Sequence, residues 1–469
     1  YNSLEGVQKL NSAEKEKGHS HSHSHSHSHS HSHSHSHGGG LEEGVETVPY
    51  WLDTAPAFED GATDPIVGDV DVVIVGGGLT GLSAAITLAR KGTQVVLFEK
   101  DTVGFSASGR NGGMCTPGLA TDPSIALERH GLARAKEMYL SYNSAINYVE
   151  KLIVEEKIDC DFERTGKLTL ASKPHHYTNF EKRHNLLAEH FDYETSLIPH
   201  ADIRSEIGSD SYYGGLLDKQ GAGLHVGKFV RGLARVAHKL GVRIYENTPV
   251  TKSRRIDGFE HELTTPKGTV RAAKILLATG SKTGAPFGWF QRRIVPVGSF
   301  IIVTEPLSQE LTDDILPMRR MASDSLNISH YFRITPDNRL LFGGRARFAI
   351  SNPTSDRKSG RILKRNMLAV LPQLRDTRID YCWGGLVDLT IDRLPRAGEK
   401  NGLFYSMGYS GHGTQMSTYM GAQLAEIMDG KVGNNVWRES QWSAIPGHFG
   451  PPWFLPLVGM YYRIKDNIS

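Results

Sequence analysis

The chain has 469 residues, of which 53 are basic and 51 acidic, so its formal charge at pH 7 is only +2. This near balance excludes the strongly basic surface typical of nucleic-acid-binding proteins and favours a small-molecule partner, while the length is enough for two or three domains. The three cysteines are too few for a disulfide framework and favour a reduced, cytoplasmic protein, and no run of about 18 apolar residues predicts a transmembrane segment.

The first 44 residues have the composition of an addition to the folded chain. His19–His37 alternates strictly between His and Ser and is followed by three glycines. This pattern is typical of a purification tag with its linker, although a natural His-rich metal-binding tract has the same composition. We expect residues 1–44 to be disordered and residues 45–66 to form a lead-in containing Tyr50 and Trp51. We predict no metal site in the folded chain.

A glycine-rich turn after the first strand predicts a dinucleotide site. The apolar strand 70–75 leads into Gly76, Gly78 and Gly81, which have the GxGxxG spacing, and then into a helix ending near residue 91. The first glycine permits the tight turn, the second lets the backbone approach a pyrophosphate, and the third lets helix and strand pack closely. The helix N-terminus offers unpaired N–H groups to the phosphates.

A second apolar strand, 94–98, ends at Glu99, where an acid is expected to bind ribose hydroxyls. An acid at this position argues against a cofactor with a 2′-phosphate. Three glycines after a strand can form a simple turn, but the two strands, the helix and the acid together favour dinucleotide binding.

Apolar periodicity predicts the remaining elements. We expect helices over 124–158, 177–190 and 227–240, the first as one long or two abutting helices, and strands over 162–171, 242–245, 250–253, 261–265 and 272–279. A second block has strands over 292–304 and 339–344 and a helix over 358–371, which suits a substrate domain. A strand over 402–407, a glycine turn over 408–413 and a helix over 415–428 then return the chain to the nucleotide-binding half.

These elements predict an α/β fold with a discontinuous, Rossmann-like nucleotide-binding domain over 67–158, 215–288 and 386–435. Residues 159–214 and 289–385 form the predicted substrate domain, an α+β unit with a mostly antiparallel sheet. Residues 436–469 are a C-terminal segment. Within it, Trp453–Tyr462 predicts a packed segment, with contact to a membrane surface as the alternative.

Several motifs together resemble one family. Besides the glycine turn, they are SGRNGG at 108–113, ATG at 278–280, WGGLVDLTIDRLP at 383–395 and GYSGHG at 408–413. They resemble the D-amino-acid-oxidase-like flavoproteins over Pro49–Asp466. Through the GRNGG loop, GAGLH at 221–225 and the ending LVGMYYRIKD, the chain looks most similar to the gamma-glutamylputrescine oxidoreductase branch.

The resemblance implies FAD as the cofactor. The FAD-binding residues implied are Gly76, Gly78, Leu79, Thr80, Gly81, Glu99, Lys100, Ser106, Ser108, Arg110, Asn111, Gly112, Gly113, Val250, Thr279, Gly280, Gly411, His412, Gly413 and Thr414. His412 is either a neighbour of the flavin or a structural histidine in a turn. Relatives that attach the flavin covalently use a Cys where this chain has Gly385, three residues from Cys382, or a His in the loop that here reads 106–111 and contains none. We therefore expect noncovalent FAD.

Departures from the family pattern bear on the substrate. Glycine-oxidase-like members place a carboxylate-binding Arg where this chain has Val387, and sarcosine-oxidase-like members place a Lys where it has Thr414 and Gln415. A simple α-amino acid is therefore a poor fit unless Arg333 or Arg345 binds its carboxylate. An amine whose carboxylate lies far from the reacting carbon, such as gamma-glutamylputrescine, suits better.

The activity implied is oxidation of an amine C–N bond to an imine by hydride transfer to flavin N5. A Lys credited with oxygen activation in sarcosine-oxidase-like members is replaced by Leu341, which leaves oxygen, a quinone or a protein as acceptor. The candidate catalytic residues are His225, Arg333 and Trp383. Each has a structural alternative: a histidine preceding a helix, a surface ion pair and core packing, respectively.

Three other functions stay open. One is an amino-acid or N-methyl amino-acid oxidase of the same superfamily, and another is a flavin-binding protein without amine oxidation activity. A flavoprotein hydroxylase or other NAD(P)H-linked enzyme needs a second nicotinamide fingerprint, and the sequence has no second GxGxxG followed by a strand and an acid.

Overall fold

The computed structural model describes residues 41, 43–66, 68–345, 351–431, 435–438 and 440–468. Apart from Leu41, Glu43 and Gly44, the predicted tag and linker lie outside the described residues.

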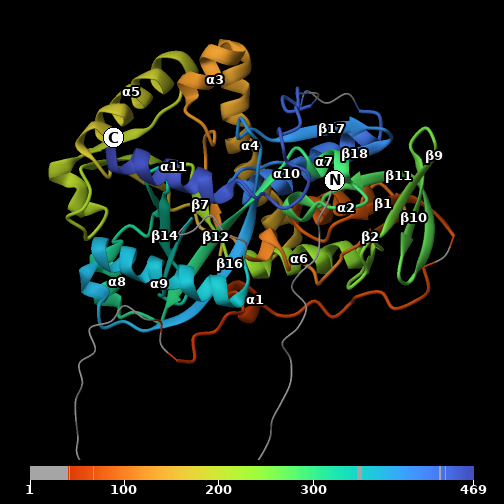
Figure 1. The fold of residues 1–469 in the computed structure, drawn as a ribbon, viewed down its shortest axis with the longest axis horizontal. Helices are drawn as coiled ribbons and strands as arrows, with labels where there is room; N and C mark the ends of the chain where they lie inside the picture. The colour runs from red at the N-terminus through yellow and green to blue at the C-terminus, as the bar shows by residue number, and fades with distance from the viewer. Residues whose placement is uncertain are drawn as a thin grey trace, which may run out of the picture. The chain divides into compact units, whose positions relative to one another are not determined.

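The first of two eight-stranded sheets in the described chain carries the predicted nucleotide-binding half (Figure 1). Its strands are β1 (Asp69–Val75), β2 (Val95–Phe98), β8 (Arg243–Tyr245), β9 (Lys252–Asp257), β10 (Glu260–Thr265), β11 (Gly268–Leu277), β17 (Arg396–Lys400) and β18 (Leu403–Met407). The order is β17-β18-β11-β1-β2-β8, and β9 and β10 extend from β11 as an antiparallel pair. The four pairs β18–β11, β11–β1, β1–β2 and β2–β8 are parallel. Early, middle and late segments thus share one sheet, as the sequence predicts.

Helices pack closely against this sheet because small residues lie at their contacts. They are α2 (Leu79–Ala89), α4 (Leu132–Glu156), α6 (Val226–Lys239) and α10 (Gly413–Met428), with α10 against α2 and α4, and α2 against α6. A Cβ atom on Gly81 would lie 2.0 Å from the Gly76 carbonyl oxygen, and one on Gly421 would lie 2.2 Å from the Thr80 carbonyl oxygen. A side chain at either position would force the helices away from their neighbours.

The second sheet has the order β16-β12-β15-β14-β13-β4-β6-β5. Its strands are β4 (Lys167–Leu170), β5 (Ser196–Pro199), β6 (Gly214–Asp218), β12 (Val295–Thr304), β13 (Met321–Asp324), β14 (His330–Ile334), β15 (Leu340–Gly344) and β16 (Ile379–Leu389). Only the β13–β4 pair is parallel, so the predicted antiparallel character is confirmed. Phe300, Phe332 and Phe342 of this sheet pack against Leu363 and Met367 of α9 (Pro353–Val370) in one buried cluster.

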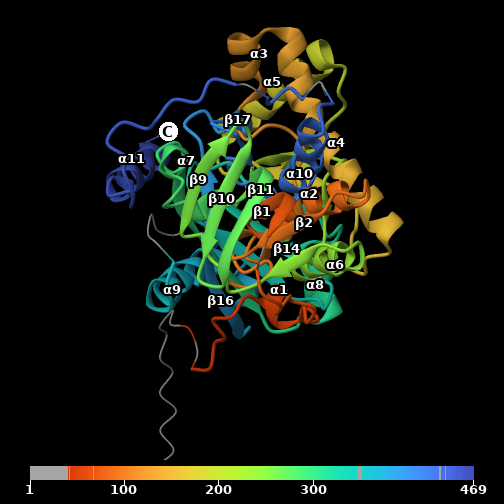
Figure 2. The same ribbon diagram turned by 90° about the vertical axis from the view of Figure 1, so that its right-hand side faces the viewer.

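The remaining elements lie around the sheets (Figures 1 and 2). They are α1 (Tyr50–Asp53), α3 (Pro123–His130), α5 (Pro174–Phe191), α7 (Gly288–Gln291), α8 (Gln309–Ile315), α11 (Leu455–Ile468), β3 (Met114–Cys115) and β7 (Ala222–Gly223). In both views α3 and α5 lie at the top, and α1 lies at the bottom.

Asp122 caps α3 by accepting a hydrogen bond from the Ser124 N–H, and α3 ends at Gly131, whose φ of +77° separates it from α4. The helix predicted over 124–158 is therefore two helices.

Other predictions from the sequence differ from the structure in detail. The strands β5, β6, β13, β16 and β17 and the helix α8 were not predicted. Two predicted domain boundaries, 214/215 and 385/386, fall inside β6 and β16, which both belong to the second sheet. These strands carry glycines and lack the polar and apolar alternation that marks a half-buried strand.

The two ends of the described chain pack differently. Tyr50 and Trp51 of the lead-in are buried. In α11, Leu455 and Gly459 are buried, whereas the Trp453 side chain just before the helix and Tyr461 within it are 70% and 62% exposed. The predicted packed C-terminal segment therefore packs by one face only. No helix of the described chain is long and apolar enough to span a membrane.

Candidate functional site

A cavity of about 980 Å³ lies where the parallel strands of the first sheet end. The residues at the carboxyl ends of β1, β2 and β11 line it, and so do Lys167 and Thr169 of β4 and Tyr331 of β14 in the second sheet. The volume is within the range of ligand pockets. A single cavity therefore joins the glycine turn to the predicted substrate domain.

The glycine turn leaves no room for side chains. Gly76 has a φ of +116°, and a Cβ atom there would lie 2.3 Å from the Ala278 carbonyl oxygen. On Gly78 it would lie 2.6 Å from Ser108 Oγ. Bare backbone therefore faces the cavity at the N-terminus of α2, the arrangement that binds a pyrophosphate.

Glu99, at the end of β2, closes one side of this turn. Its Oε2 accepts a hydrogen bond from the Gly77 N–H at 2.7 Å and its Oε1 accepts one from the Asp101 N–H at 2.8 Å. Burial raises the pKa of Glu99, and the two backbone N–H groups oppose that shift. The carboxyl group lines the cavity where the sequence predicts a contact with ribose.

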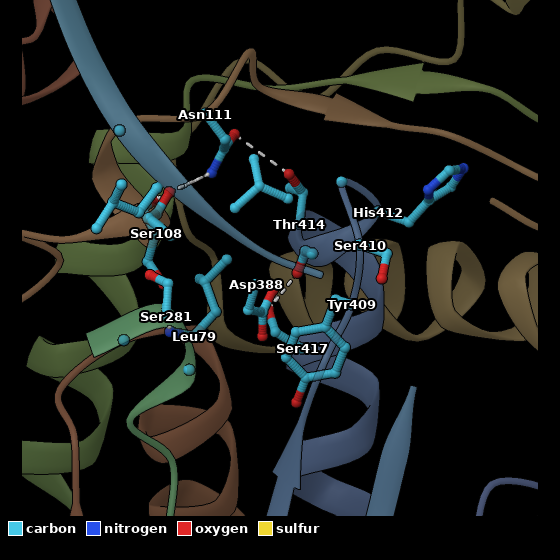
Figure 3. A pocket seen from close by; sticks show the side chains of 18 of the residues that line it. Leu79, Ser108, Asn111, Ser281, Asp388, Tyr409, Ser410, His412, Thr414 and Ser417 are labelled. Carbon is cyan, nitrogen blue, oxygen red and sulfur yellow. Dashed lines mark hydrogen bonds between the residues drawn. The ribbon is translucent and has the colours of Figure 1, made fainter. Parts of the chain in front are cut away.

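The loop 106–113 links the two helix N-termini at the cavity (Figure 3). Ser108 Oγ accepts a hydrogen bond from the Leu79 N–H at 3.0 Å. Asn111 Oδ1 accepts from the Gly113 N–H at 2.8 Å and from Thr414 Oγ1 at 3.2 Å, while its Nδ2 donates to the Ala107 carbonyl at 3.1 Å. Asn111 thus joins the loop to the first turn of α10.

Hydrogen bonds from other segments of the protein hold the GYSGHG turn in place. Tyr409 donates to or accepts from Thr80 Oγ1 at 2.8 Å and Ser406 Oγ at 2.9 Å. Asp388 Oδ2 accepts from the Gly408 N–H at 2.7 Å, and burial raises the pKa of Asp388 to about 6. Gly411 has a φ of +95°, and a Cβ atom there would meet no protein atom within 4 Å.

Polar atoms without partners point to a bound group. Ser281 Oγ and His412 Nδ1 are buried, line the cavity and have no hydrogen-bond partner among the described residues. Burial, followed by the charge of Lys167, lowers the pKa of His412 to about 4, so its ring is neutral at pH 7. Unsatisfied buried polar atoms carry a free-energy cost that a ligand removes. The glycine turn, the open Gly411 and these atoms fit FAD.

Most of the residues predicted to bind FAD line this one cavity. They are Gly76, Gly78, Leu79, Thr80, Glu99, Lys100, Ser106, Ser108, Arg110, Asn111, Gly112, Val250, Thr279, Gly280, Gly411, His412, Gly413 and Thr414. Gly81 and Gly113 do not line it. Gly81 instead packs α2 on β1, and the Gly113 carbonyl accepts a hydrogen bond from behind the loop.

Two of the three residues predicted to be catalytic donate hydrogen bonds to backbone carbonyl groups of the loop 106–113. Arg333 Nη1 donates to the Gly113 carbonyl at 2.6 Å and the Leu224 carbonyl at 2.9 Å. Trp383 Nε1 donates to the Arg110 carbonyl at 3.0 Å. Trp51 Nε1 makes a third such bond, to the Asn111 carbonyl at 2.7 Å, which the sequence did not reveal. Arg333 and Trp383 are buried and do not line the cavity.

The third residue, His225, has a structural role at the start of α6. Its Nδ1 accepts a hydrogen bond from the Lys228 N–H at 3.1 Å, and its Nε2 lies 2.8 Å from Thr54 Oγ1. Burial lowers the pKa of His225 to about 4. His225, Arg333 and Trp383 are not among the residues that line this cavity.

The charged groups on the substrate side of the cavity include Lys167, Arg345 and Arg393, of which the sequence singled out only Arg345, as an alternative carboxylate-binding residue. Lys167 is buried and donates a hydrogen bond to Ser323 Oγ, and burial lowers the pKa of Lys167 to about 7. Arg345 and Arg393 also line this side. A lysine at a strand start and an arginine in a turn are normally solvated, so composition alone gave no signal for them.

Val387, Leu341 and Gln415 are positions at which this chain departs from the family pattern. Val387 lines the cavity, whereas Leu341 is buried elsewhere in the core. Gln415 Nε2 donates to the Thr116 carbonyl at 2.7 Å, and Gln415 does not line the cavity. The described residues contain no group of three or more His, Cys, Asp or Glu side chains that could hold a metal ion.

Known proteins support this assignment. The family model described as FAD dependent oxidoreductase (DAO) matches residues 71–427. Gamma-glutamylputrescine oxidoreductase of Escherichia coli (strain K12) is 32% identical over 405 residues, covering 85% of this chain and 93% of that protein. Probable oxidoreductase OrdL of Haemophilus influenzae is 33% identical over 366 residues, covering 77% of this chain and 83% of that protein.

The fold has a solved counterpart. Glycine oxidase from Geobacillus kaustophilus superposes with a TM-score of 0.65 at 20% identity, covering 82% of this chain and 99% of that chain. The match to the family model and the match over most of two relatives show that the protein is an enzyme with FAD as its cofactor. The chain belongs to the DAO family of FAD-dependent oxidoreductases.

Proposed function

We propose that this enzyme oxidises the C–N bond of an amine whose carboxylate lies far from the reacting carbon, with gamma-glutamylputrescine as the first candidate. The observation that carries the proposal is Val387, which lines the cavity on β16. In glycine-oxidase-like enzymes the family pattern places a carboxylate-binding Arg there. An α-carboxylate beside an apolar wall would lose that charge-assisted partner, at a cost of roughly 1.5–3 kcal/mol. The 32% identity to gamma-glutamylputrescine oxidoreductase supports the same substrate class.

When bound, FAD would supply the oxidising chemistry by accepting a hydride from the carbon of the C–N bond, with loss of a proton from the amine nitrogen and reaction of the imine product with water. The chain positions and solvates the reacting groups. The N-terminus of α10 and the N–H groups of the GYSGHG turn meet the cavity, where the positive end of the helix dipole stabilises negative charge. His412, neutral at pH 7, adds no charge there.

We propose that FAD is held noncovalently. Cys382 is buried, donates its Sγ–H to the Asp356 carbonyl at 3.2 Å and does not line the cavity. Burial raises the pKa of the Cys382 thiol to about 12, which keeps it in the unreactive form at neutral pH. Gly385, the position that the family pattern would give to a flavin-linked Cys, lines the cavity without a side chain.

We further propose that the segments 67–158, 215–288 and 386–435 supply the FAD-binding domain and 159–214 and 289–385 the substrate domain, except that β6 and β16, which these boundaries cut, belong entirely to the sheet of the substrate domain. The first sheet draws its strands from these three segments. The electron acceptor is oxygen or another acceptor such as a quinone, since Leu341 provides no charge for oxygen activation.

The test is anaerobic reduction of the flavin by a panel of amines. The panel contains gamma-glutamylputrescine, free putrescine, an N-methyl amine, glycine, and D- and L-amino acids, and bleaching of the visible flavin spectrum is followed. We expect the gamma-glutamylated amine to reduce the flavin fastest at low concentration. Reduction by α-amino acids alone would show that the reasoning from Val387 is wrong. Lack of bleaching by every compound would support a flavin-binding protein without amine oxidation activity.

A second stage separates the acceptors. The reduced enzyme is mixed with air-saturated buffer or with a soluble quinone, and the rate of flavin reoxidation is measured. A slow reaction with oxygen and a fast reaction with quinone would assign a dehydrogenase, and the reverse would assign an oxidase.

A further inference from the structure

Two arginines on the substrate side of the cavity have no acidic partner in the described chain. Arg345 follows β15 directly, and Arg393 lies in the turn between β16 and β17 with a φ of +60°. Both line the cavity, and neither forms an ion pair with any described residue. Burial, followed by the charge of Arg393, lowers the pKa of Arg345 to about 10, so Arg345 is charged at pH 7.

Five acids of the described chain line the same cavity; Asp101 follows Glu99 at the end of β2 on the first sheet, and the other four have partners of their own. Asp122 pairs with Arg183 at 3.0 Å, and Asp218 accepts hydrogen bonds from the Tyr193 hydroxyl at 2.7 and 2.8 Å. Glu99 and Asp388 accept from backbone N–H groups at the cofactor end. Arg345 and Arg393 are half-buried, and a partly desolvated cation without a counter-ion is destabilising, so this pair beside a cavity indicates a ligand that supplies negative charge.

The phosphates of FAD are not that negative charge. The glycine turn and the N-terminus of α2 provide their binding site on the first sheet, whereas Arg345 extends from the second sheet, beside Tyr331. Tyr331 lines the cavity too and shares a hydrogen bond of 3.0 Å with Ser299 Oγ. The anion recognised by Arg345 and Arg393 is therefore carried by the substrate.

We propose that Arg345 and Arg393 form a clamp for the carboxylate of the substrate at the end remote from the reacting amine. This inference rests on the proposed function and deepens it, since it assigns the residues that select a carboxylated amine over a free diamine. Guanidinium groups suit this role because they donate several hydrogen bonds in a plane that matches a carboxylate. The γ-glutamyl group carries such a carboxylate at the opposite end from the primary amine.

The test compares two substrates that differ only in that carboxylate. Gamma-glutamylputrescine and its α-carboxamide are used to reduce the holoenzyme anaerobically, and the half-saturation concentration and limiting rate of flavin reduction are measured for each. In the wild type we expect the carboxylate to lower the half-saturation concentration by roughly 10- to 150-fold. Arg345→Gln and Arg393→Gln should each remove at least tenfold of this preference, with the carboxamide parameters unchanged, and Arg345→Lys should restore part of it.

Two controls test whether the effect is specific to Arg345 and Arg393 and whether it arises through the flavin. Arg375→Gln removes an exposed arginine outside the cavity and should leave the preference unchanged. The reduction potential of bound FAD is measured for each variant. A lowered potential with an unaltered preference for the carboxylate would show that the arginines act on the flavin, and would overturn the proposal, as would full preference in both Gln variants.

A binding measurement separates this proposal from the proposed function. Gamma-glutamyl-n-butylamide keeps the γ-glutamyl end and lacks the reacting amine, so its binding is measured by calorimetry on the oxidised holoenzyme. Binding that is weakened at least tenfold in both Gln variants supports the clamp even if no amine of the panel reduces the flavin. Equal binding by the wild type and both variants overturns the clamp, even if gamma-glutamylputrescine is the substrate.

Discussion

The glycine turn allows a sharp test of why Gly76 is glycine. In Gly76→Ala the new Cβ atom would lie 2.3 Å from the Ala278 carbonyl oxygen and 2.8 Å from its carbon, at a φ of +116°. The positive φ alone costs an alanine about 1–3 kcal/mol. Relieving the contact requires β1 and the segment after β11 to move apart, which adds a further 1–3 kcal/mol by analogy with overpacked cores.

Gly92→Ala is the matched control. Gly92 has a φ of +83°, but a Cβ atom there would meet nothing within 4 Å, so this variant carries the conformational cost without the contact. Urea unfolding of the two apoproteins at 25 °C measures the difference. We expect Gly76→Ala to be less stable than Gly92→Ala by about 1–3 kcal/mol. Equal losses of stability would refute the reasoning from the close approach to Ala278.

Three further predictions concern the cavity and its wall. Gly411→Ala should weaken FAD binding but destabilise the apoprotein no more than Gly92→Ala does, because its Cβ atom meets no protein atom. FAD titration followed by fluorescence measures the first effect, and urea unfolding measures the second. Unchanged FAD affinity would place the cofactor away from Gly411. Lys167→Met should stabilise the apoprotein more at pH 7.5 than at pH 9.5. The folded pKa of Lys167 is about 7 and the unfolded one is near ~10.4. Between these two pH values the unfolded chain holds one more proton than the folded chain, so the free energy of unfolding of the wild type rises with pH by up to about 1.4 kcal/mol per pH unit. Urea unfolding at several pH values measures this rise. A difference in unfolding free energy between wild type and variant that does not change with pH would contradict the lowered pKa. Trp383→Phe and Trp437→Phe each remove a buried indole with one hydrogen bond, to the Arg110 carbonyl and to Ser141 Oγ respectively, and should destabilise by similar amounts, about 1–3 kcal/mol. Only Trp383→Phe should increase the dissociation constant for FAD, and an equal effect in both would contradict a role for Trp383 in holding the loop.

The cofactor half could be predicted because its signals are local. A buried strand, three glycines at fixed spacing and the following helix lie within about 20 residues, so the pattern is readable in one stretch of sequence even though Gly76 packs against the distant Ala278. The same holds for α10, whose glycine turn and apolar helix are continuous in sequence. β18 lies beside β11 and parallel to it, a pairing of distant segments that no local pattern predicts.

The substrate half was less accessible because its key contacts join distant segments. Arg333 contacts carbonyl groups at Gly113 and Leu224, and no periodicity predicts that it points toward the loop instead of into the cavity. Lys167 and Arg393 have the composition of surface residues, and only the packing of the second sheet around the cavity places them there. On β16 Trp383 is buried and Val387 lines the cavity although the two residues, four apart, lie on the same face of the strand, so the packing along the strand and not its periodicity distinguishes them.

The separation of the cavity wall along the chain has a consequence for biosynthesis. The first glycine turn leaves the ribosome early, but Ala278, against which Gly76 packs, follows about 200 residues later, and the GYSGHG turn follows still later. The flavin therefore meets a complete binding site only when nearly the whole chain has been synthesised and both flanking strands have joined β1. Uptake of the cofactor is then a late step that distinguishes finished molecules from unfinished ones, and bound FAD stabilises only the completed fold.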